Sequence, residues 1–248
     1  MHPTIGTVRA AREPSFRRHP SRCYIYRMNN VTGIILAGGK SSRLGYPKYR
    51  ATLDGKSLLE IAISKLEPFC EEIIVASKEP ISRRFFASAQ NDTSFCHPEE
   101  PQRGDARISG HIVNIIEQSQ EFHPLIGITE GLKASKNDAN IILACDTPFI
   151  STKLLNDLTN STAEICLYRY KGRAEPLLGL YRKSCLKKID HQPSATSHQP
   201  RIIDILSKCN LEYIDVENES LDFFNINTKE DLIEAEKRVR SNPKLLGN

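Results

Sequence analysis

A short apolar run that leads directly into two glycines limits most strongly what this chain can fold into. Residues 31–37 are apolar and partly β-branched, which is typical of a strand covered on both faces in a parallel sheet. Gly38 and Gly39 follow at once, and a backbone without side chains lets main-chain N–H groups approach an anion closely. Arg43 and Lys48 add positive charge within ten residues. The segment predicts a buried strand followed by a loop that holds phosphates.

The loop matches neither of the two common phosphate-binding patterns. It lacks the earlier glycine of the G-x-x-x-x-G-K-[ST] loop, and it lacks the spacing of the G-x-G-x-x-G loop. An ordinary strand-to-helix turn with a solvated basic face would use the same residue types. The loop alone therefore leaves both interpretations open.

Apolar periodicity along the rest of the chain alternates between strand and helix, as a parallel sheet requires. Further strands are predicted at 72–76, 112–116, 139–145, 163–168, 176–181 and 211–216. Helices are predicted at 57–66, 125–134, 151–158, 200–208 and 228–240. Right-handed crossovers place the carboxyl ends of the first, second and fourth strands at one edge of the sheet, where ligands of such sheets bind.

Asp146 directly follows the predicted strand at 139–145, and Pro148 restricts the turn after it. We expect its side chain to project over the sheet edge toward the glycine loop. A carboxylate that faces phosphates is unfavourable unless a hard cation lies between them, and Mg²⁺ is often held by one or two carboxylates plus phosphate oxygens. Asp146 is therefore the predicted Mg²⁺ ligand. Its alternative role is to cap the next helix, although Ser151 is better placed for that.

Lys48 and Arg43 are the predicted catalytic cations beside Asp146. Lys48 would act on phosphates as a point charge, and the planar fork of Arg43 can bind two phosphate oxygens. Solvated surface side chains are the alternative. Asn225 and Asn227 alternate on an extended segment, so both amides face one side. They could instead satisfy backbone donors before the final helix.

Five segments, in this order, resemble the motifs of the MobA-like nucleotidyltransferases, and most of all those of the molybdenum cofactor guanylyltransferases. They are Leu-Ala-Gly-Gly-Lys-Ser-Ser-Arg-Leu-Gly at 36–45, Leu-Asp-Gly-Lys-Ser-Leu-Leu-Glu at 53–60, His-Pro-Leu-Ile-Gly-Ile at 123–128, Cys-Asp-Thr-Pro-Phe-Ile at 145–150 and Phe-Asn-Ile-Asn-Thr-Lys-Glu-Asp-Leu at 224–232. The resemblance covers residues 32 to about 240.

The resemblance implies a Rossmann-like three-layer nucleotidyltransferase fold with a mostly parallel sheet. It implies an enzyme that uses Mg²⁺ to transfer GMP from GTP to the terminal phosphate of molybdopterin, with release of pyrophosphate. Molybdoenzymes or their cofactor-delivery proteins would be further partners. The residues that it assigns to nucleotide, acceptor or metal binding are Leu36, Ala37, Gly38, Gly39, Lys48, Ser77, Glu117, Asp146, Asn225 and Asn227.

The chain departs from the family pattern at four positions. Pro47 stands before the lysine where the family usually has Asp, and Ser77 stands near the place of an Asn that contacts the nucleotide. His123 replaces the glycine that begins the family's third motif. The family has an acidic residue a few positions before that motif, and Glu117 is the nearest one here. Pro47 resembles sugar-phosphate nucleotidyltransferases of the same superfold, which affects the predicted substrate more than the predicted reaction.

Two alternative functions stay open. The first is a related transferase that uses CTP or another nucleoside triphosphate on molybdopterin or on a sugar phosphate. The second is a non-catalytic module that carries the cofactor to a molybdoenzyme. Glycines 38 and 39 together with Lys48 and Asp146 argue against the second alternative.

Charge and cysteine content exclude several other classes of function. The net charge is +4, but residues 1–27 hold six arginines against one glutamate, and the other residues hold 28 basic against 29 acidic side chains. The basic balance therefore makes no case for nucleic-acid binding. Seven cysteines form no C-x-x-C pair and no zinc pattern, which predicts reduced thiols in a cytoplasmic protein. No apolar run is long enough for a membrane span.

Two segments are predicted to lie outside the fold. Residues 1–27 are rich in Arg, Ser and Pro, so we expect a non-structural extension with the domain starting at Met28; a transit peptide is the alternative. Residues 80–110 keep neither the helical nor the strand period, so we expect an exposed, mobile insertion. One domain is predicted over 28–240, with a tail at 241–248.

Overall fold

A computed structural model describes residues 30–39, 43–82, 106–109, 112–119, 123–190 and 201–246. The predicted extension at 1–27 and residues 83–105 of the predicted insertion lie outside the described residues. In the part of the chain that the structure describes, no helix has the length and apolar character to cross a membrane.

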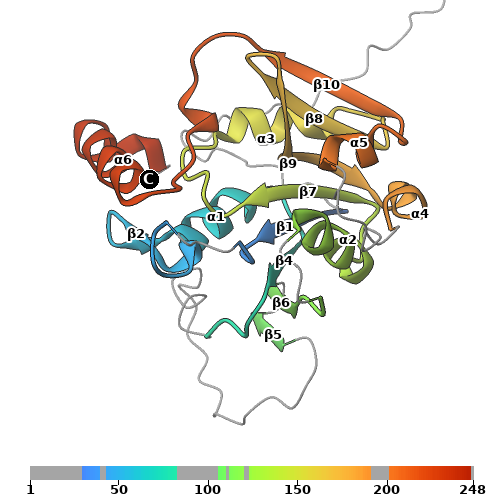
Figure 1. The fold of residues 1–248 in the computed structure, drawn as a ribbon, viewed down its shortest axis with the longest axis horizontal. Helices are drawn as coiled ribbons and strands as arrows, with labels where there is room; N and C mark the ends of the chain where they lie inside the picture. Colours follow the sequence, from blue (N-terminus) through green and yellow to red (C-terminus); the bar gives the residue numbers. More distant parts are fainter. Residues whose placement is uncertain are drawn as a thin grey trace, which may run out of the picture.

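One sheet of eight strands forms the centre of the molecule and runs through the whole view of Figure 1. In sheet order the strands are β10 (Leu211–Val216), β8 (Ile165–Tyr170), β9 (Arg173–Arg182), β7 (Ala139–Ala144), β1 (Val31–Leu36), β4 (Glu72–Ser77), β6 (Ile112–Ile116) and β5 (Ala106–Ser109). Strands β7, β1, β4 and β6 run parallel, as do β8 and β10. Strand β9 is antiparallel to both of its neighbours, and β5 is antiparallel to β6. The predicted α/β fold with a mostly parallel sheet is confirmed.

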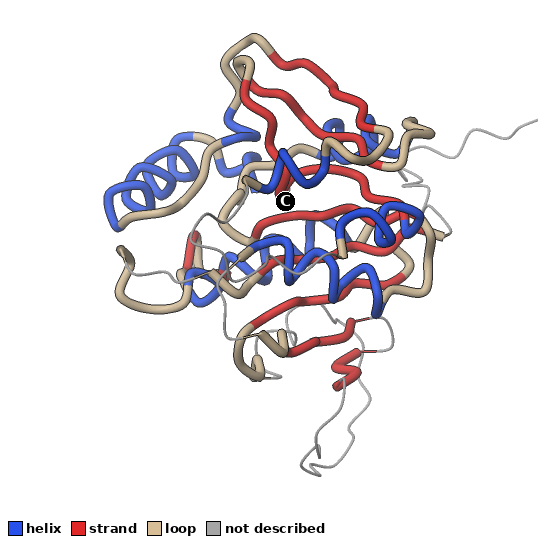
Figure 2. The backbone as a smooth tube through the Cα atoms, turned by 45° about the vertical axis from the view of Figure 1, so that its right-hand side comes forward, coloured by secondary structure: helices blue, strands red, loops and turns tan. Residues whose placement is uncertain are grey.

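Helices cover both faces of the sheet, and the strands alternate their apolar side chains between the two layers. Helices α1 (Leu58–Leu66) and α3 (Thr152–Thr159) pack on one face. Helices α2 (Pro124–Ala134), α4 (Leu186–Ile189) and α5 (Ile202–Leu206) pack on the other. On β1 the fully buried Ile35 faces the first layer and Ile34 faces the second. Figure 2 shows these helices in blue around the red strands.

A third apolar cluster joins the C-terminal helix to the start of the fold. Helix α6 (Lys229–Ser241) packs against the short strand β2 (Thr52–Leu53), which pairs with β3 (Lys56–Ser57), and against α1. Capping boxes begin both helices, at Ser57 for α1 and at Thr228 for α6, because each N-cap oxygen accepts an N–H that the helix leaves unpaired.

The structure corrects the sequence analysis at three places. Residues 241–246, within the predicted tail, are packed, because a 3-10 turn, η5 (Pro243–Leu246), buries Leu246 and the Leu245 carbonyl accepts from Lys65 Nζ at 3.3 Å. Residues 106–109, within the predicted insertion, form strand β5. The hairpin of β2 and β3 was not predicted, because strands of two residues carry no readable period.

Close packing between β8 and β9 requires a glycine at position 179, in the middle of β9. A Cβ atom at this position would lie 2.5 Å from Leu167 Cδ2 and 2.6 Å from the Cys166 carbonyl oxygen of β8. We expect Gly179→Ala to lower the free energy of unfolding by about 2 kcal/mol or more, because the contact with the Cys166 carbonyl cannot be relieved without moving the backbone of β8 or β9. Denaturant unfolding measures this change.

Gly39→Ala is the matched control for stability, since a Cβ atom at Gly39 would meet nothing within 4 Å. Its free energy of unfolding should stay within about 0.5 kcal/mol of the parent protein. If Gly179→Ala unfolds like the control, the close packing of β8 against β9 is wrong.

Candidate active site

A cavity of about 360 Å³ opens at the carboxyl ends of β1, β4 and β7, the sheet edge that the topology predicted for a ligand. The ladders continue one residue past the strands, because Ala37 N–H donates to the Ala76 carbonyl at 2.8 Å and Cys145 N–H donates to the Leu36 carbonyl at 3.3 Å. The residues that line the cavity are Leu36, Ala37, Gly38, Gly39, Lys48, Lys78, Glu117, His123, Pro124, Ala144, Cys145, Asp146 and Leu177.

The two glycines after β1 lie in this cavity, as predicted for a phosphate-binding loop. A Cβ atom at Gly38 would stand 2.7 Å from Glu117 Oε1, and one at Gly127 in α2 would stand 2.9 Å from the same oxygen. Glycine at both positions therefore leaves room for the Glu117 carboxylate between β1 and α2.

Lys48 and Asp146 line one side of the cavity, and Asn227, which does not line it, contacts Lys48. Lys48 begins the 3-10 turn η1 (Lys48–Arg50), and its Nζ lies 2.6 Å from Asp146 Oδ2 and 2.6 Å from Asn227 Oδ1. The Ile226 N–H donates to the Asp146 carbonyl at 2.9 Å, which ties the segment before α6 to the end of β7. The structure thus brings together three predicted site residues that lie far apart in the sequence.

Asp146 also fits the predicted metal ligand. Its carboxylate is 17% exposed and lines the cavity, and Asn227 Oδ1 accepts a hydrogen bond from the same Lys48 Nζ that contacts it. Among the described residues no three His, Cys, Asp or Glu side chains converge on a common point. A cation here would take one carboxylate from the protein and its other ligands from phosphate oxygens and water, which is an arrangement that suits Mg²⁺.

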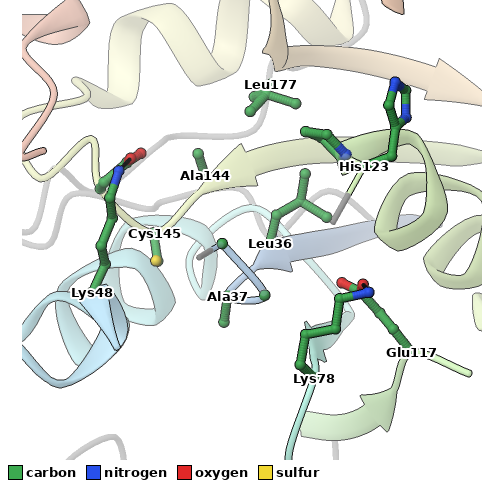
Figure 3. A pocket seen from close by; sticks show the side chains of 13 residues that line it. Leu36, Ala37, Lys48, Lys78, Glu117, His123, Ala144, Cys145 and Leu177 are labelled. Carbon is green, nitrogen blue, oxygen red and sulfur yellow. Dashed lines mark hydrogen bonds and ion pairs between the residues drawn. The ribbon is translucent and has the colours of Figure 1, made fainter. Parts of the chain in front are cut away.

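An ion pair on the opposite wall of the cavity contains a residue that the sequence analysis missed. Lys78 Nζ lies 2.7 Å from Glu117 Oε2 and donates to the Ser119 carbonyl at 3.0 Å. Figure 3 shows Lys48 at one side of the cavity and the Lys78–Glu117 pair at the other. The signal in the sequence was a lysine directly after the second strand.

Ser77 and Arg43 are predicted site residues that line neither this cavity nor the adjoining one, which Asn225 and Asn227 line. Ser77 is fully buried, where its Oγ donates to the Glu79 carbonyl at 2.7 Å and accepts from Asn114 Nδ2 at 2.9 Å. Arg43 is exposed and does not line the cavity; its charge instead helps to lower the pKa of Asp231 at the start of α6. The largest effects on that carboxyl are burial, which raises its pKa, and then backbone N–H groups, which lower it.

His123 and Cys145 also line the cavity, where His123 begins a helix and Cys145 is a buried thiol. His123 is the N-cap of α2, and its Nδ1 accepts from the Leu125 N–H at 3.3 Å. Burial raises the pKa of the Cys145 thiol far above its usual range, and the nearby negative charge of Asp146 raises it further. The thiol therefore stays protonated and is a poor nucleophile.

A second cavity of about 240 Å³ adjoins the first on the far side of Asp146. Asp146, Ala144 and Leu177 line both cavities. Both predicted asparagines line the second one; Asn225 Nδ2 also donates to the Phe223 carbonyl at 3.2 Å. The carboxylate thus stands between two adjoining spaces.

Proteins of related sequence carry guanylyltransferase names. A probable molybdenum cofactor guanylyltransferase from Bacillus cereus strain AH820 is 27% identical over 216 residues, which cover 85% of this chain and 98% of the relative. Its counterpart in Bacillus anthracis strain CDC 684 has the same identity and coverage.

Solved structures share the fold at lower identity. Molybdopterin-guanine dinucleotide biosynthesis protein A from Archaeoglobus fulgidus matches with a TM-score of 0.63 and 21% identity, over 85% of this chain and 99% of that one. A putative glucose-1-phosphate thymidylyltransferase from Bacillus anthracis matches with a TM-score of 0.64 and 15% identity, over 85% and 95%. The two matched structures carry different functional names, so their likeness shows the fold of this chain and no particular substrate.

The family model described as the MobA-like NTP transferase domain matches residues 33–209 of this chain. That range covers most of the sequence and includes the glycine loop, Lys48, the Lys78–Glu117 pair and Asp146. The chain belongs to the family of MobA-like nucleotidyltransferases.

Proposed function

We propose that this protein transfers GMP from GTP to the terminal phosphate of molybdopterin, with Mg²⁺ as its cofactor, and releases pyrophosphate. The observation that carries the proposal is the position of Asp146 between two adjoining cavities. A transfer between two bound substrates needs a reaction centre that both can reach, and a shared wall provides one. The names of the relatives support guanylyl transfer to molybdopterin as the particular reaction.

The first cavity has the features of a site for the triphosphate. Gly38 and Gly39 leave main-chain groups accessible, and Lys48 supplies the positive charge on the same wall. Asn227 Oδ1 holds the Lys48 ammonium at 2.6 Å, so the charge is positioned before a nucleotide binds. Such preorganised charge stabilises the negative charge that develops on the departing pyrophosphate.

The second cavity would hold the acceptor, whose phosphate oxygen attacks the α-phosphorus as the bond to pyrophosphate breaks. Mg²⁺ held by Asp146 would supply charge neutralisation and a common anchor for the phosphates of both substrates. Asn225 and Asn227 line the acceptor side, where their amides can bind without adding negative charge. No nucleophile on the protein is required, which agrees with the buried, protonated Cys145.

The Lys78–Glu117 pair supports guanine as the base. The N1–H and 2-amino groups of guanine are adjacent donors for a carboxylate, and its O6 is an acceptor for an ammonium. Glu117 and Lys78 supply those two partners side by side, 2.7 Å apart, at the end of the cavity away from Lys48. Cytosine presents one amino donor beside an acceptor nitrogen, so it would use only part of this pair.

A panel of nucleoside triphosphates tests the proposal. With molybdopterin present, we expect GTP to give pyrophosphate with a kcat/KM at least tenfold above that of CTP, ATP and UTP. Glu117→Gln should lower kcat/KM for GTP about tenfold or more, because a hydrogen bond to a charged group contributes about 1.5–3 kcal/mol. Pyrophosphate release at varied nucleotide concentration measures both effects.

Glu71→Gln is the matched control, since Glu71 is an exposed acid at the opposite end of β4. It should keep the nucleotide preference of the parent protein. A preference for CTP would assign a cytidylyl transfer instead, and absent turnover together with tight GTP binding would assign a carrier module.

A further inference from the structure

The second cavity contains an acidic side chain whose role the proposed reaction leaves open. Glu175 lies on β9 and lines this cavity together with Asp146, Thr147, Phe223 and the two asparagines. It does not line the first cavity, where the triphosphate is proposed to bind. Any role of Glu175 in binding therefore concerns the acceptor rather than the nucleotide.

An irregularity in the sheet positions Glu175. Along β8 and β9, Leu167 pairs with Gly179, but the next residue, Tyr168, pairs with Glu175, so three residues of β9 bulge out of the ladder. Tyr181 Oη donates to the Pro176 carbonyl at 2.6 Å and holds the bulge in place. Bulges beside functional sites re-aim side chains, and this one directs Glu175 and Leu177 to the cavity.

The surroundings of Glu175 favour a ligand that donates hydrogen bonds. Burial raises the pKa of its carboxyl, and Arg173 opposes that shift only in part. In the part of the chain that the structure describes, no group donates a hydrogen bond to this carboxyl. A partly buried carboxylate that accepts no hydrogen bond is unfavourable, so a bound molecule with N–H or O–H donors would stabilise it.

The other walls favour a flat, uncharged ring. Leu177 and Leu178 are apolar, and the Phe223 ring is fixed by Tyr170, which stacks on it with centroids 4.3 Å apart. Tyr168 packs against the same ring edge-on, with centroids 5.7 Å apart. Among the described residues that line this cavity there is no Lys or Arg, so a phosphate fits only at the Asp146 end near Lys48.

We propose that Glu175 determines the specificity for the acceptor by accepting two hydrogen bonds from the 2-amino-4-oxopyrimidine edge of a pterin. The N3–H and 2-amino groups of that ring are adjacent donors, which match the two oxygens of one carboxylate. The inference rests on the proposed function, because it places the acceptor phosphate at Asp146 and the ring of the same molecule at Glu175. A sugar in this cavity would offer hydroxyl groups but no such pair of N–H donors.

Binding of two fluorescent probes tests Glu175 without turnover. Pterin carries the 2-amino group, and lumazine carries an oxygen at the same ring position. We expect the parent protein to bind pterin at least tenfold more tightly than lumazine, because lumazine would set an acceptor against a carboxylate. Glu175→Gln should reduce this ratio to within about twofold, since a carboxamide both donates and accepts.

Steady-state kinetics supply the second readout. Glu175→Gln should raise KM for molybdopterin about tenfold and leave KM for GTP within about twofold, because only the acceptor loses a contact. Glu217→Gln is the matched control, because Glu217 is an exposed acid directly after β10. It should change neither KM value. Melting temperature shows whether each variant is folded.

The outcomes separate the inference from the proposed function. If Glu175→Gln keeps the pterin preference, or if the parent protein binds neither probe, the role of Glu175 is overturned while guanylyl transfer can still be observed. If the parent protein gives no pyrophosphate with molybdopterin and any nucleotide, the proposed function fails, and a pterin preference lost in Glu175→Gln still supports the inference.

Discussion

Asp146→Asn is expected to lower kcat for pyrophosphate release at least about a hundredfold, since single preorganised charge contacts at reaction centres contribute about 10²–10³ in rate. The carboxylate lines both cavities, and its Oδ2 lies 2.6 Å from Lys48 Nζ. An amide has the same shape but no charge to hold a divalent cation. The fold should persist, because the backbone carbonyl of this residue keeps its bond from Ile226 N–H.

Asp190→Asn is the control for this prediction. Asp190 is an exposed acid that also pairs with a lysine, Lys133, at 2.6 Å, but it lies at the far end of α2 from the cavity. It should retain the activity of the parent protein. Activity of Asp146→Asn within threefold of the parent would show that this carboxylate holds no catalytic cation.

Lys48→Ala is expected to lower kcat/KM for GTP about a hundredfold, with a raised KM for GTP, because the variant loses a charge-assisted contact to the triphosphate. The removal also leaves Asp146 and Asn227 without the ammonium that both contact at 2.6 Å. Initial rates at varied GTP and fixed, saturating molybdopterin measure the effect.

Lys133→Ala is the matched control, since it removes an exposed lysine that pairs with a carboxylate away from the cavity. It should leave both constants unchanged. If Lys48→Ala changes only KM for molybdopterin, then Lys48 serves the acceptor, and its assignment to the triphosphate is wrong.

The position of the site followed from local patterns in the sequence. The apolar runs of β1 and β7 end directly before Gly38 and Asp146, and parallel pairing of those strands brings the two ends to one edge. Strand periodicity and turn residues are short-range properties, so they can be read without knowing the rest of the fold. The agreement of β1, β4, β6 and β7 with their predicted ranges, to within about one residue at each end, reflects this.

The errors at the second strand show where local patterns stop being sufficient. The strand was predicted to end at Ala76 but continues through Ser77. Side chains alternate along a strand, so the extension decides which neighbour faces the cavity. As a result Ser77 is buried against Asn114, and the unpredicted Lys78 reaches Glu117 in the cavity.

The fold class, the family and the edge of the sheet that carries the cavity could be read from the amino-acid sequence, because these depend on periodicity and on motifs of neighbouring residues. The contacts within the site became visible only in three dimensions: Lys48 with Asp146 and Asn227, Lys78 with Glu117, and Glu175 in the second cavity. These contacts join residues up to 179 positions apart, and the bulge that directs Glu175 depends on the pairing of β9 with two other strands. Such geometry arises from packing between distant segments, which no local pattern encodes.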